Sequence, residues 1–180
     1  MSGFSRWAAG GIAALAGPLV ARYIEVQRDR LASTATPLSE VSKLRLRQHF
    51  SDDDLERVRV VQADQLPILH PPFYPVLRRL RLDIPEPSLV EAITFDYVIA
   101  ARETMSLPLL LHEMVHVVQY RLLGEKRFSR LYVKGFFAAG GYHAIPLERC
   151  ASEMEQRYLT AKEPFDVESE IANWINRGLF

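Results

Sequence analysis

Residues 109–118 read LLLHEMVHVV, an apolar run interrupted only by His112, Glu113 and His116. A helix that is apolar all round is buried inside a protein. Histidines four residues apart lie one turn apart on the same side of a helix, so both imidazoles can reach one ion. Glu113 projects beside that side, where a carboxylate can hold a proton without binding the metal. The stretch therefore predicts a buried, metal-binding helix.

Signals that start and stop a helix flank this stretch. Ser106 is a favourable N-cap residue, and Pro108 is tolerated in the first turn that follows. Gly124 then supplies a stop after Leu123. We expect a single helix between these signals.

The two histidines need a third protein ligand. The elongated metzincin motif is excluded, because Val118 and Leu122 stand where that motif needs glycine and histidine. Glu148 follows Pro146 in the first turn of an expected helix, and such a rigid position suits a ligand carboxylate. We favour Glu148. The remaining downstream candidates are His143, Glu153 and Glu155.

Two imidazoles and a carboxylate are a ligand set that suits Zn²⁺. Left unpaired in an apolar helix, these groups would cost several kcal/mol, and a bound cation removes that cost. The competing interpretations give these residues structural roles without a metal. The histidines can be core residues with Glu113 in a salt bridge, and Glu148 can be a first-turn glutamate favoured by the helix dipole.

Three stretches together resemble a known family. They are residues 110–120 (LLHEMVHVVQY), 141–142 (GY) and 145–151 (IPLERCA). They are similar to a bacterial group of zincin-like metallopeptidase domains of the gluzincin class, over about residues 90–158. The resemblance implies zinc held by His112, His116 and Glu148, with Glu113 as the general base of peptide-bond hydrolysis. It also implies a peptide or protein substrate, paired in extended form with the strand before the metal helix.

One position departs from the gluzincin pattern. Related domains often place an aspartate four residues after the ligand glutamate, where this chain has Ser152. Support for a ligand histidine must then come from another residue. Gln119, one turn beyond His116, is a candidate for that support or for substrate contact, although a buried glutamine bonded to backbone is an equally good interpretation.

A hydrolase of this type also needs a donor for the oxyanion that develops on the substrate. Tyr142 and His143 follow two glycines and precede the expected ligand helix, so either is a candidate donor. Both can equally be aromatic anchors of a loop. We read His49 and His70 as surface or loop histidines.

The rest of the sequence predicts an α+β fold of the zincin type. Alternating residues predict strands at 57–62 and 92–100, the second with Ile93, Phe95, Tyr97 and Ile99 on one face. Periodicity and stop signals predict helices at 38–50, 126–138, 146–159 and 167–176, with a break at 51–54. Six prolines mark residues 66–87 as rich in loops.

We divide the chain into an apolar N-terminal helix (1–32) and a zincin-like metallopeptidase domain (38–180). Residues 7–21 are apolar but weakly hydrophobic, and Arg22 ends the run short of the roughly 20 residues that span a bilayer. Either a packed or surface-lying helix or a targeting or anchoring segment fits this pattern. Membrane association through residues 1–24 is therefore a hypothesis.

The charge balance and cysteine content of the chain argue against some classes of function. Among 180 residues, 22 basic side chains balance 22 acidic ones, which argues against a nucleic-acid partner. A single cysteine, Cys150, cannot form an intrachain disulfide. The main alternative to an enzyme is a structural or interaction module in which zinc only staples a small fold.

Overall fold

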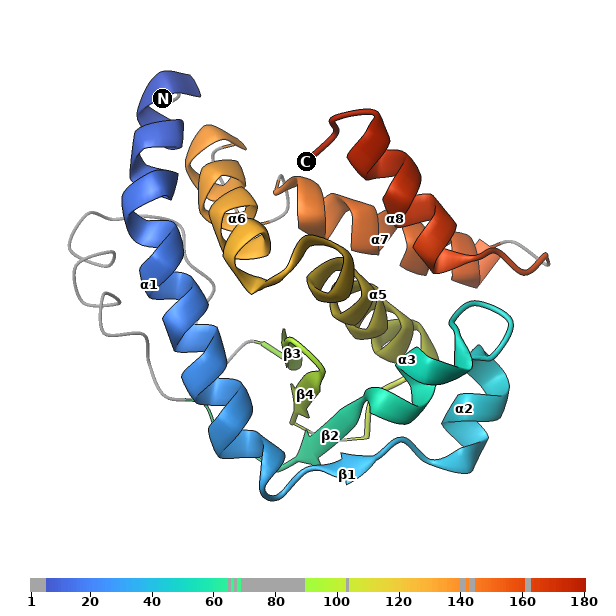
Figure 1. The fold of residues 1–180 in the computed structure, drawn as a ribbon. Coiled ribbons are helices and arrows are strands. Elements are labelled where there is room, and N and C mark those ends of the chain that lie inside the picture. Colours follow the sequence, from blue (N-terminus) through green and yellow to red (C-terminus); the bar gives the residue numbers. More distant parts are fainter. Residues whose placement is uncertain are drawn as a thin grey trace.

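The computed structural model of the chain is an α+β fold, as the sequence predicted (Figure 1). It describes residues 6–64, 66, 68, 90–102, 104–139, 142, 145–160 and 163–180. The helices of this part are α1 (Arg6–Ala32), α2 (Glu40–Leu46), α3 (Asp52–Arg57), α5 (Leu107–Leu123), α6 (Glu125–Ala139), α7 (Pro146–Thr160) and α8 (Val167–Asn176). The strands are β1 (Thr36–Pro37), β2 (Arg59–Gln62), β3 (Ala92–Phe95) and β4 (Val98–Ala101).

The sheet lies between α1 and α5 (Figure 1). Its strand order is β1-β2-β4-β3, with β2 and β4 parallel and the other neighbours antiparallel. Ile99 in β4 packs in one hydrophobic cluster with Leu111 of α5, whereas Val98 and Ala100 pack in another with Ile24 of α1. Because successive side chains of a strand point to opposite faces, one face of the sheet packs against α5 and the other against α1.

The prediction of one strand over residues 92–100 was wrong, because this segment is a hairpin. β3 and β4 pair antiparallel with Phe95 opposite Val98, which leaves Asp96 and Tyr97 as the turn. Asp96 has a φ of 56°, a left-handed conformation that aspartate tolerates better than most residues. The apolar alternation continues through the turn without a glycine to mark it, so the pattern reads as one strand.

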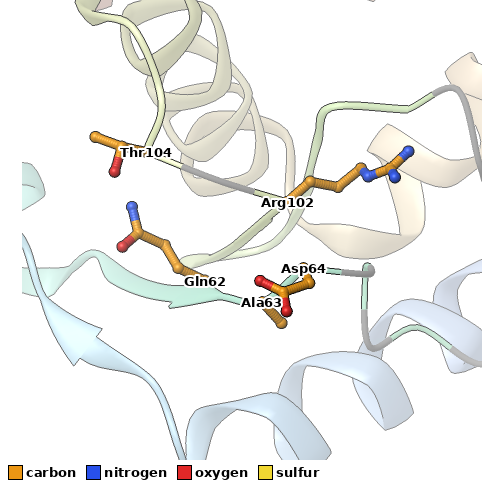
Figure 2. Close-up of a pocket in the computed structure, with 5 residues that line it drawn as sticks. All are labelled: Gln62, Ala63, Asp64, Arg102 and Thr104. Atoms are coloured by element: carbon orange, nitrogen blue, oxygen red, sulfur yellow. The ribbon is translucent and has the colours of Figure 1, made fainter.

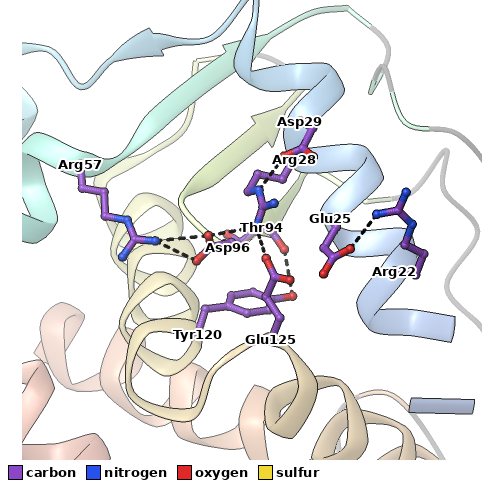
Figure 3. Close-up of polar contacts among 9 residues, drawn as sticks. All are labelled: Arg22, Glu25, Arg28, Asp29, Arg57, Thr94, Asp96, Tyr120 and Glu125. Atoms are coloured by element: carbon purple, nitrogen blue, oxygen red, sulfur yellow. Dashed lines mark hydrogen bonds and ion pairs between the residues drawn. The ribbon is translucent and has the colours of Figure 1, made fainter. Parts of the chain in front are cut away.

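Ion pairs hold this turn against the neighbouring helices (Figure 3). The carboxylate of Asp96 lies 3.5 Å from Arg28 of α1 and 3.2 Å from Arg57 of α3. Arg28 also pairs with Glu125, the first residue of α6. Arg28, Asp96 and Glu125 are largely shielded from water, which makes their pairing stronger than that of exposed ions. Residues far apart in sequence therefore stabilise the turn.

Helix α5, which carries His112 and His116, has the predicted ends. The hydroxyl of Ser106 accepts a hydrogen bond from the backbone N–H of Leu109 at 3.4 Å, and Pro108 lies in the first turn. Gly124 ends the helix with a φ of 73°, which favours glycine. The helices predicted at 126–138, 146–159 and 167–176 are α6, α7 and α8 with bounds that agree within one residue.

The segment from 38 to 57 differs from its prediction. The helix expected over 38–50 is shorter, and the break expected at 51–54 is instead the start of α3. Ser51 caps α3 by accepting from the N–H of Asp54 at 3.1 Å. Acidic residues in a first turn are favoured by the helix dipole, so these residues begin a helix.

His49 lies in the turn between α2 and α3, as a loop histidine would, but it is buried, so the surface interpretation was wrong. Its Nδ1 lies 3.1 Å from the carbonyl oxygen of Phe165, a residue of the segment before α8. A contact 116 residues away cannot be read from local sequence. His70 lies outside the described residues, as does most of the proline-rich 66–87 segment.

The N-terminal helix α1 packs along α6. A Cβ atom at Gly17 would lie 2.5 Å from Cγ of Arg130 and 3.3 Å from its Cα, so only glycine permits this approach of the two helices. In the described part of the chain, no helix has the length and apolarity needed to cross a membrane.

Candidate metal centre

Three donor atoms from α5 and α7 form a nearly equilateral triangle. The Nε2 atoms of His112 and His116 lie 3.2 Å apart. Oε2 of Glu148 lies 3.5 Å from the first and 3.4 Å from the second. The structure thus brings together the three residues that the sequence favoured as ligands, and they could hold a metal ion.

The size of the triangle fits a small ion with tetrahedral geometry. Metal–ligand bonds of about 2.0–2.1 Å place the donors of a tetrahedral site about 3.3 Å apart. The three observed separations lie on both sides of that value. Among the described residues, the donors that lie close enough together to share an ion come from His112, His116 and Glu148. Three is also the number of protein ligands in catalytic zinc sites.

Helix geometry and helix packing produce this arrangement. The helical period puts His112 and His116 on one side of α5, and α7 packs against α5 with Glu148 in its first turn. Gly135 of α6 makes room for the start of α7, because a Cβ there would lie 2.8 Å from Cδ of Pro146. The position of Glu148 therefore depends on α6 as well as α7.

A second set of hydrogen bonds orients both imidazoles. Nδ1 of His112 lies 3.1 Å from Oε2 of Glu155, and Nδ1 of His116 lies 2.9 Å from Oε1 of Gln119. Because these oxygens accept, each Nδ1 donates and each Nε2 is left to bind a metal. Gln119 also donates to the carbonyl oxygen of Leu147 at 3.1 Å, which ties the start of α7 to α5.

The ligands perturb one another's pKa in opposite directions. Burial alone would lower the pKa of His116, but the nearby Glu148 carboxylate raises it to about 9. Burial alone would raise the pKa of Glu148, but the two imidazoles hold it well below its usual range. Carboxylate and imidazolium thus stabilise each other, and a metal cation bound between these residues would take the place of the proton on His116.

Glu113 lies apart from the triangle and bonds to the sheet. The hydroxyl of Thr94 in β3 donates to Oε2 of Glu113 at 2.6 Å and lies 3.2 Å from its carbonyl oxygen. Burial raises the pKa of Glu113 above its usual range, although the nearby imidazoles oppose that shift. A carboxylate in such a setting is a stronger proton acceptor than an exposed one.

Two tyrosines lie beside the ligand carboxylate. Burial and the charge of Glu148 raise the pKa of Tyr142 and of Tyr132 far above the usual value, so both phenols keep their protons. Tyr142, one of the two candidate oxyanion donors, therefore interacts with Glu148, whereas His143 is outside the described residues. Tyr132 was not predicted, because nothing in the α6 sequence marks it as a neighbour of Glu148.

The other carboxylates considered from the sequence have different partners. Glu153 points into solvent and lies 3.6 Å from Arg149 on the same helix, which excludes it as a ligand in this structure. Glu155 bonds to a ligand histidine and is not a member of the triangle. Sequence reasoning missed Thr94, because only the packing of β3 on α5 brings it to Glu113.

Two surface hollows lie away from this centre. One, of about 430 Å³, is lined by residues at and beyond the ends of β2 and β4, and Figure 2 draws all five of them. The second, of about 840 Å³, adjoins it along β1 and the last turn of α1. None of the three donor residues lines either hollow.

No protein-family model, curated protein or solved structure matches this chain. The geometry by itself defines the class of site: two imidazoles and one carboxylate that lie close enough to hold one metal ion, with a second carboxylate on the same helix that is bonded to the sheet.

Proposed function

We propose that the chain is a zinc-dependent peptidase with a zincin-like fold of the gluzincin type. The observation that carries this proposal is the triangle of His112, His116 and Glu148, with edges close to those of tetrahedral zinc. Two nitrogens and one oxygen suit zinc better than calcium or magnesium, which prefer oxygen ligands. When bound, zinc supplies an acidified water and polarises a substrate carbonyl.

Glu113 is the residue that moves the proton. It follows a ligand histidine on the same helix, yet its carboxylate is held by Thr94 outside the donor triangle. It accepts a proton from the attacking water and returns it to the leaving amine. The raised pKa of Glu113 supports both steps, since the carboxylate binds a proton readily and can give it back.

Tyr142 is the favoured donor to the oxyanion that develops on the substrate carbonyl. Its phenol lies beside Glu148, and its high pKa keeps the proton available for a hydrogen bond. An extended peptide would run beside β3, the last strand in the described order of the sheet and the strand that carries Thr94. That placement puts the scissile bond near the base.

The variant Glu113→Gln tests this function against a zinc staple. It keeps the shape and a hydrogen-bonding head group but cannot accept a proton, so zinc content should stay near that of the wild type. Cleavage of a mixed peptide library, followed by mass spectrometry, should fall at least roughly 100-fold. Glu153→Gln is the matched control, because that exposed glutamate pairs only on the surface.

A wild-type protein that binds zinc fully, cleaves no peptide and shows a fourth protein ligand in zinc spectroscopy would contradict the enzymatic assignment, because a closed shell is that of a structural staple. An open water position in that sample would mean that the right substrate has not been found.

A further inference from the structure

The direction of the Glu113 side chain depends on a hydroxyl group from the sheet. Thr94 of β3 is buried, and its Oγ1 donates to Oε2 of Glu113 at 2.6 Å. The same hydroxyl lies 3.2 Å from the backbone carbonyl oxygen of Glu113. A hydroxyl has one proton, so the shorter contact with the charged acceptor is the stronger bond. Within the described part of the chain, no other side chain donates to this carboxylate.

The hairpin and α5 together hold Thr94 in place for this bond. Thr94 pairs with Ile99 across the hairpin, so both side chains lie on the face of the sheet that packs against α5. The hydroxyl of Tyr120 donates to the backbone carbonyl oxygen of Thr94, 3.5 Å away (Figure 3). Tyr120 follows Glu113 by seven residues, close to two helical turns, so both project from α5 toward β3. The backbone and the side chain of Thr94 are thus each bonded to α5.

Without the hydroxyl of Thr94, Glu113 has a competing partner at the metal centre. Glu113 follows the candidate ligand His112 directly, and its charge interacts with both imidazoles and with Glu148. A buried carboxylate that lacks a hydrogen-bond donor is costly, and a divalent cation is a strong partner for it. Zinc that takes Glu113 as a fourth protein ligand would have the closed shell of a structural site.

We propose that Thr94 is a positioning residue that keeps the Glu113 carboxylate off the metal and leaves the fourth coordination position open. This inference rests on the proposed function, because it concerns the base and the metal of the same site. A hydrogen bond to a charged group shifts an equilibrium of this kind about 10- to 100-fold. Loss of one hydroxyl is therefore enough to change a catalytic coordination shell into a structural one.

The test uses the full chain loaded with Co²⁺, which accepts the same ligands as Zn²⁺ and absorbs visible light. Azide is the probe, because this small anion takes an open coordination position and changes the spectrum. The wild-type protein should respond to azide. Thr94→Val keeps the branched shape without the hydroxyl and should bind azide at least roughly 10-fold more weakly. Its affinity for Co²⁺ should rise, since a fourth protein ligand is gained.

Three further variants separate this role from general damage to the hairpin. Thr94→Ser keeps the hydroxyl and should bind azide as the wild type does. Thr94→Ala removes the hydroxyl with less bulk and should behave as Thr94→Val does, so the test does not depend on how valine packs. Thr36→Val makes the matched change in β1, at the opposite end of the strand order, and should leave azide binding unchanged.

Removal of the Glu113 charge tests whether Thr94 acts through that residue. In Glu113→Gln the head group is neutral and a weak metal ligand, so adding Thr94→Val should not change azide binding further. The four proteins, wild type, two single variants and the double variant, measure this dependence directly. An equal loss of azide binding with and without the Glu113 charge would overturn the proposal, because Thr94 would then act by another route.

Azide binding that Thr94→Val and Thr94→Ala lose and Thr94→Ser keeps, with a higher affinity for Co²⁺, would establish the proposal. Unchanged azide binding in Thr94→Val and Thr94→Ala would overturn it and leave the proposed function intact. A lower affinity for Co²⁺ in folded Thr94→Val would also contradict it, since capture of Glu113 strengthens the site. A wild-type protein whose bound Co²⁺ does not respond to azide would overturn the proposed function and this inference together.

Discussion

Nδ1 of His112 lies 3.1 Å from Oε2 of Glu155, a residue seven positions after Glu148 on the same helix. Seven residues are close to two helical turns, so both glutamates project from the same side of α7 toward α5. Ser152, which stands where the gluzincin pattern often has an aspartate, is exposed and does not take that role. The long side chain of Glu155 supplies the support that the sequence left unassigned.

The first prediction concerns the ligands themselves. His112→Ala and His116→Ala should each strip zinc from the purified protein, because two donors hold the ion far more weakly than three. Glu148→Gln should lower zinc content strongly, whereas Glu153→Gln should leave it unchanged. Elemental analysis after desalting provides the measurement. A larger loss in His143→Ala than in Glu148→Gln would mean that the third ligand is misassigned.

The second prediction concerns the residues that orient the ligands. Glu155→Ala and Gln119→Leu each remove the acceptor of an Nδ1–H bond, so zinc affinity should fall about 10- to 100-fold. The ligands remain, and saturating zinc should still fill the site. Competition with a chromophoric chelator measures the affinity, with Glu153→Ala as the control on α7. Wild-type affinity in both variants would show that the two bonds do not orient the imidazoles.

The third prediction tests how α6 positions Glu148. Gly135→Ala would place a methyl group 2.8 Å from Cδ of Pro146 and 3.1 Å from Cγ2 of Ile145, so the start of α7 must move. We expect a loss of about 1–3 kcal/mol in the free energy of unfolding and weaker zinc binding. Urea denaturation and zinc titration measure the two effects.

The control for that substitution is Gly11→Ala. Gly11 lies in α1 with nothing within 4 Å of an added Cβ, so alanine should stabilise by about 0.5–1 kcal/mol through helix propensity alone. If Gly135→Ala behaved like Gly11→Ala, close packing between α6 and α7 would not be needed to place Glu148.

The fourth prediction is a pH dependence that arises at His49, far from the metal ligands in sequence. Burial lowers the pKa of His49 below its ordinary value of 6.5, and the nearby Arg157 adds to this effect, while the bond to Phe165 opposes it. As pH falls through about 6.5, the unfolded chain takes up a proton that the folded protein does not. The contribution of His49 to the free energy of unfolding is therefore fully present above about pH 6.5 and is lost progressively as the pH falls below that value.

His49→Asn removes this titration and keeps a donor for the Phe165 carbonyl. Urea denaturation between about pH 7.5 and 5.5 should show a wild-type stability that falls more steeply than that of the variant. Subtracting the variant's free energy of unfolding from that of the wild type at each pH removes the contributions of all other titrating groups, because the two proteins share them. Parallel curves over this range would mean that the pKa of His49 is not lowered by folding.

The sequence by itself determined helix α5. Its apolar surroundings and four-residue histidine spacing follow from helical periodicity, and Ser106 and Gly124 determine its ends through local hydrogen bonding and φ preference. These are interactions within a few residues, so one sequence is enough to find them. Glu148 was favoured as the third ligand in the same way, from its place in the first turn of an expected helix, and the structure places it beside the two histidines.

Tertiary structure alone decided which partners complete the site. Glu155 and Thr94 acquire their roles through the packing of α7 and β3 on α5. The seven-residue spacing places Glu155 on the side of α7 that carries Glu148, but only this packing brings it to His112. The bond of Gln119 to His116 is local to α5, and the sequence had named Gln119 as a candidate for that support. The hairpin turn at Asp96 likewise depends on Arg28, 68 residues away. Side-chain contacts of this kind arise from the whole fold, because residues distant in the chain must first be brought together before charge and hydrogen bonding can act.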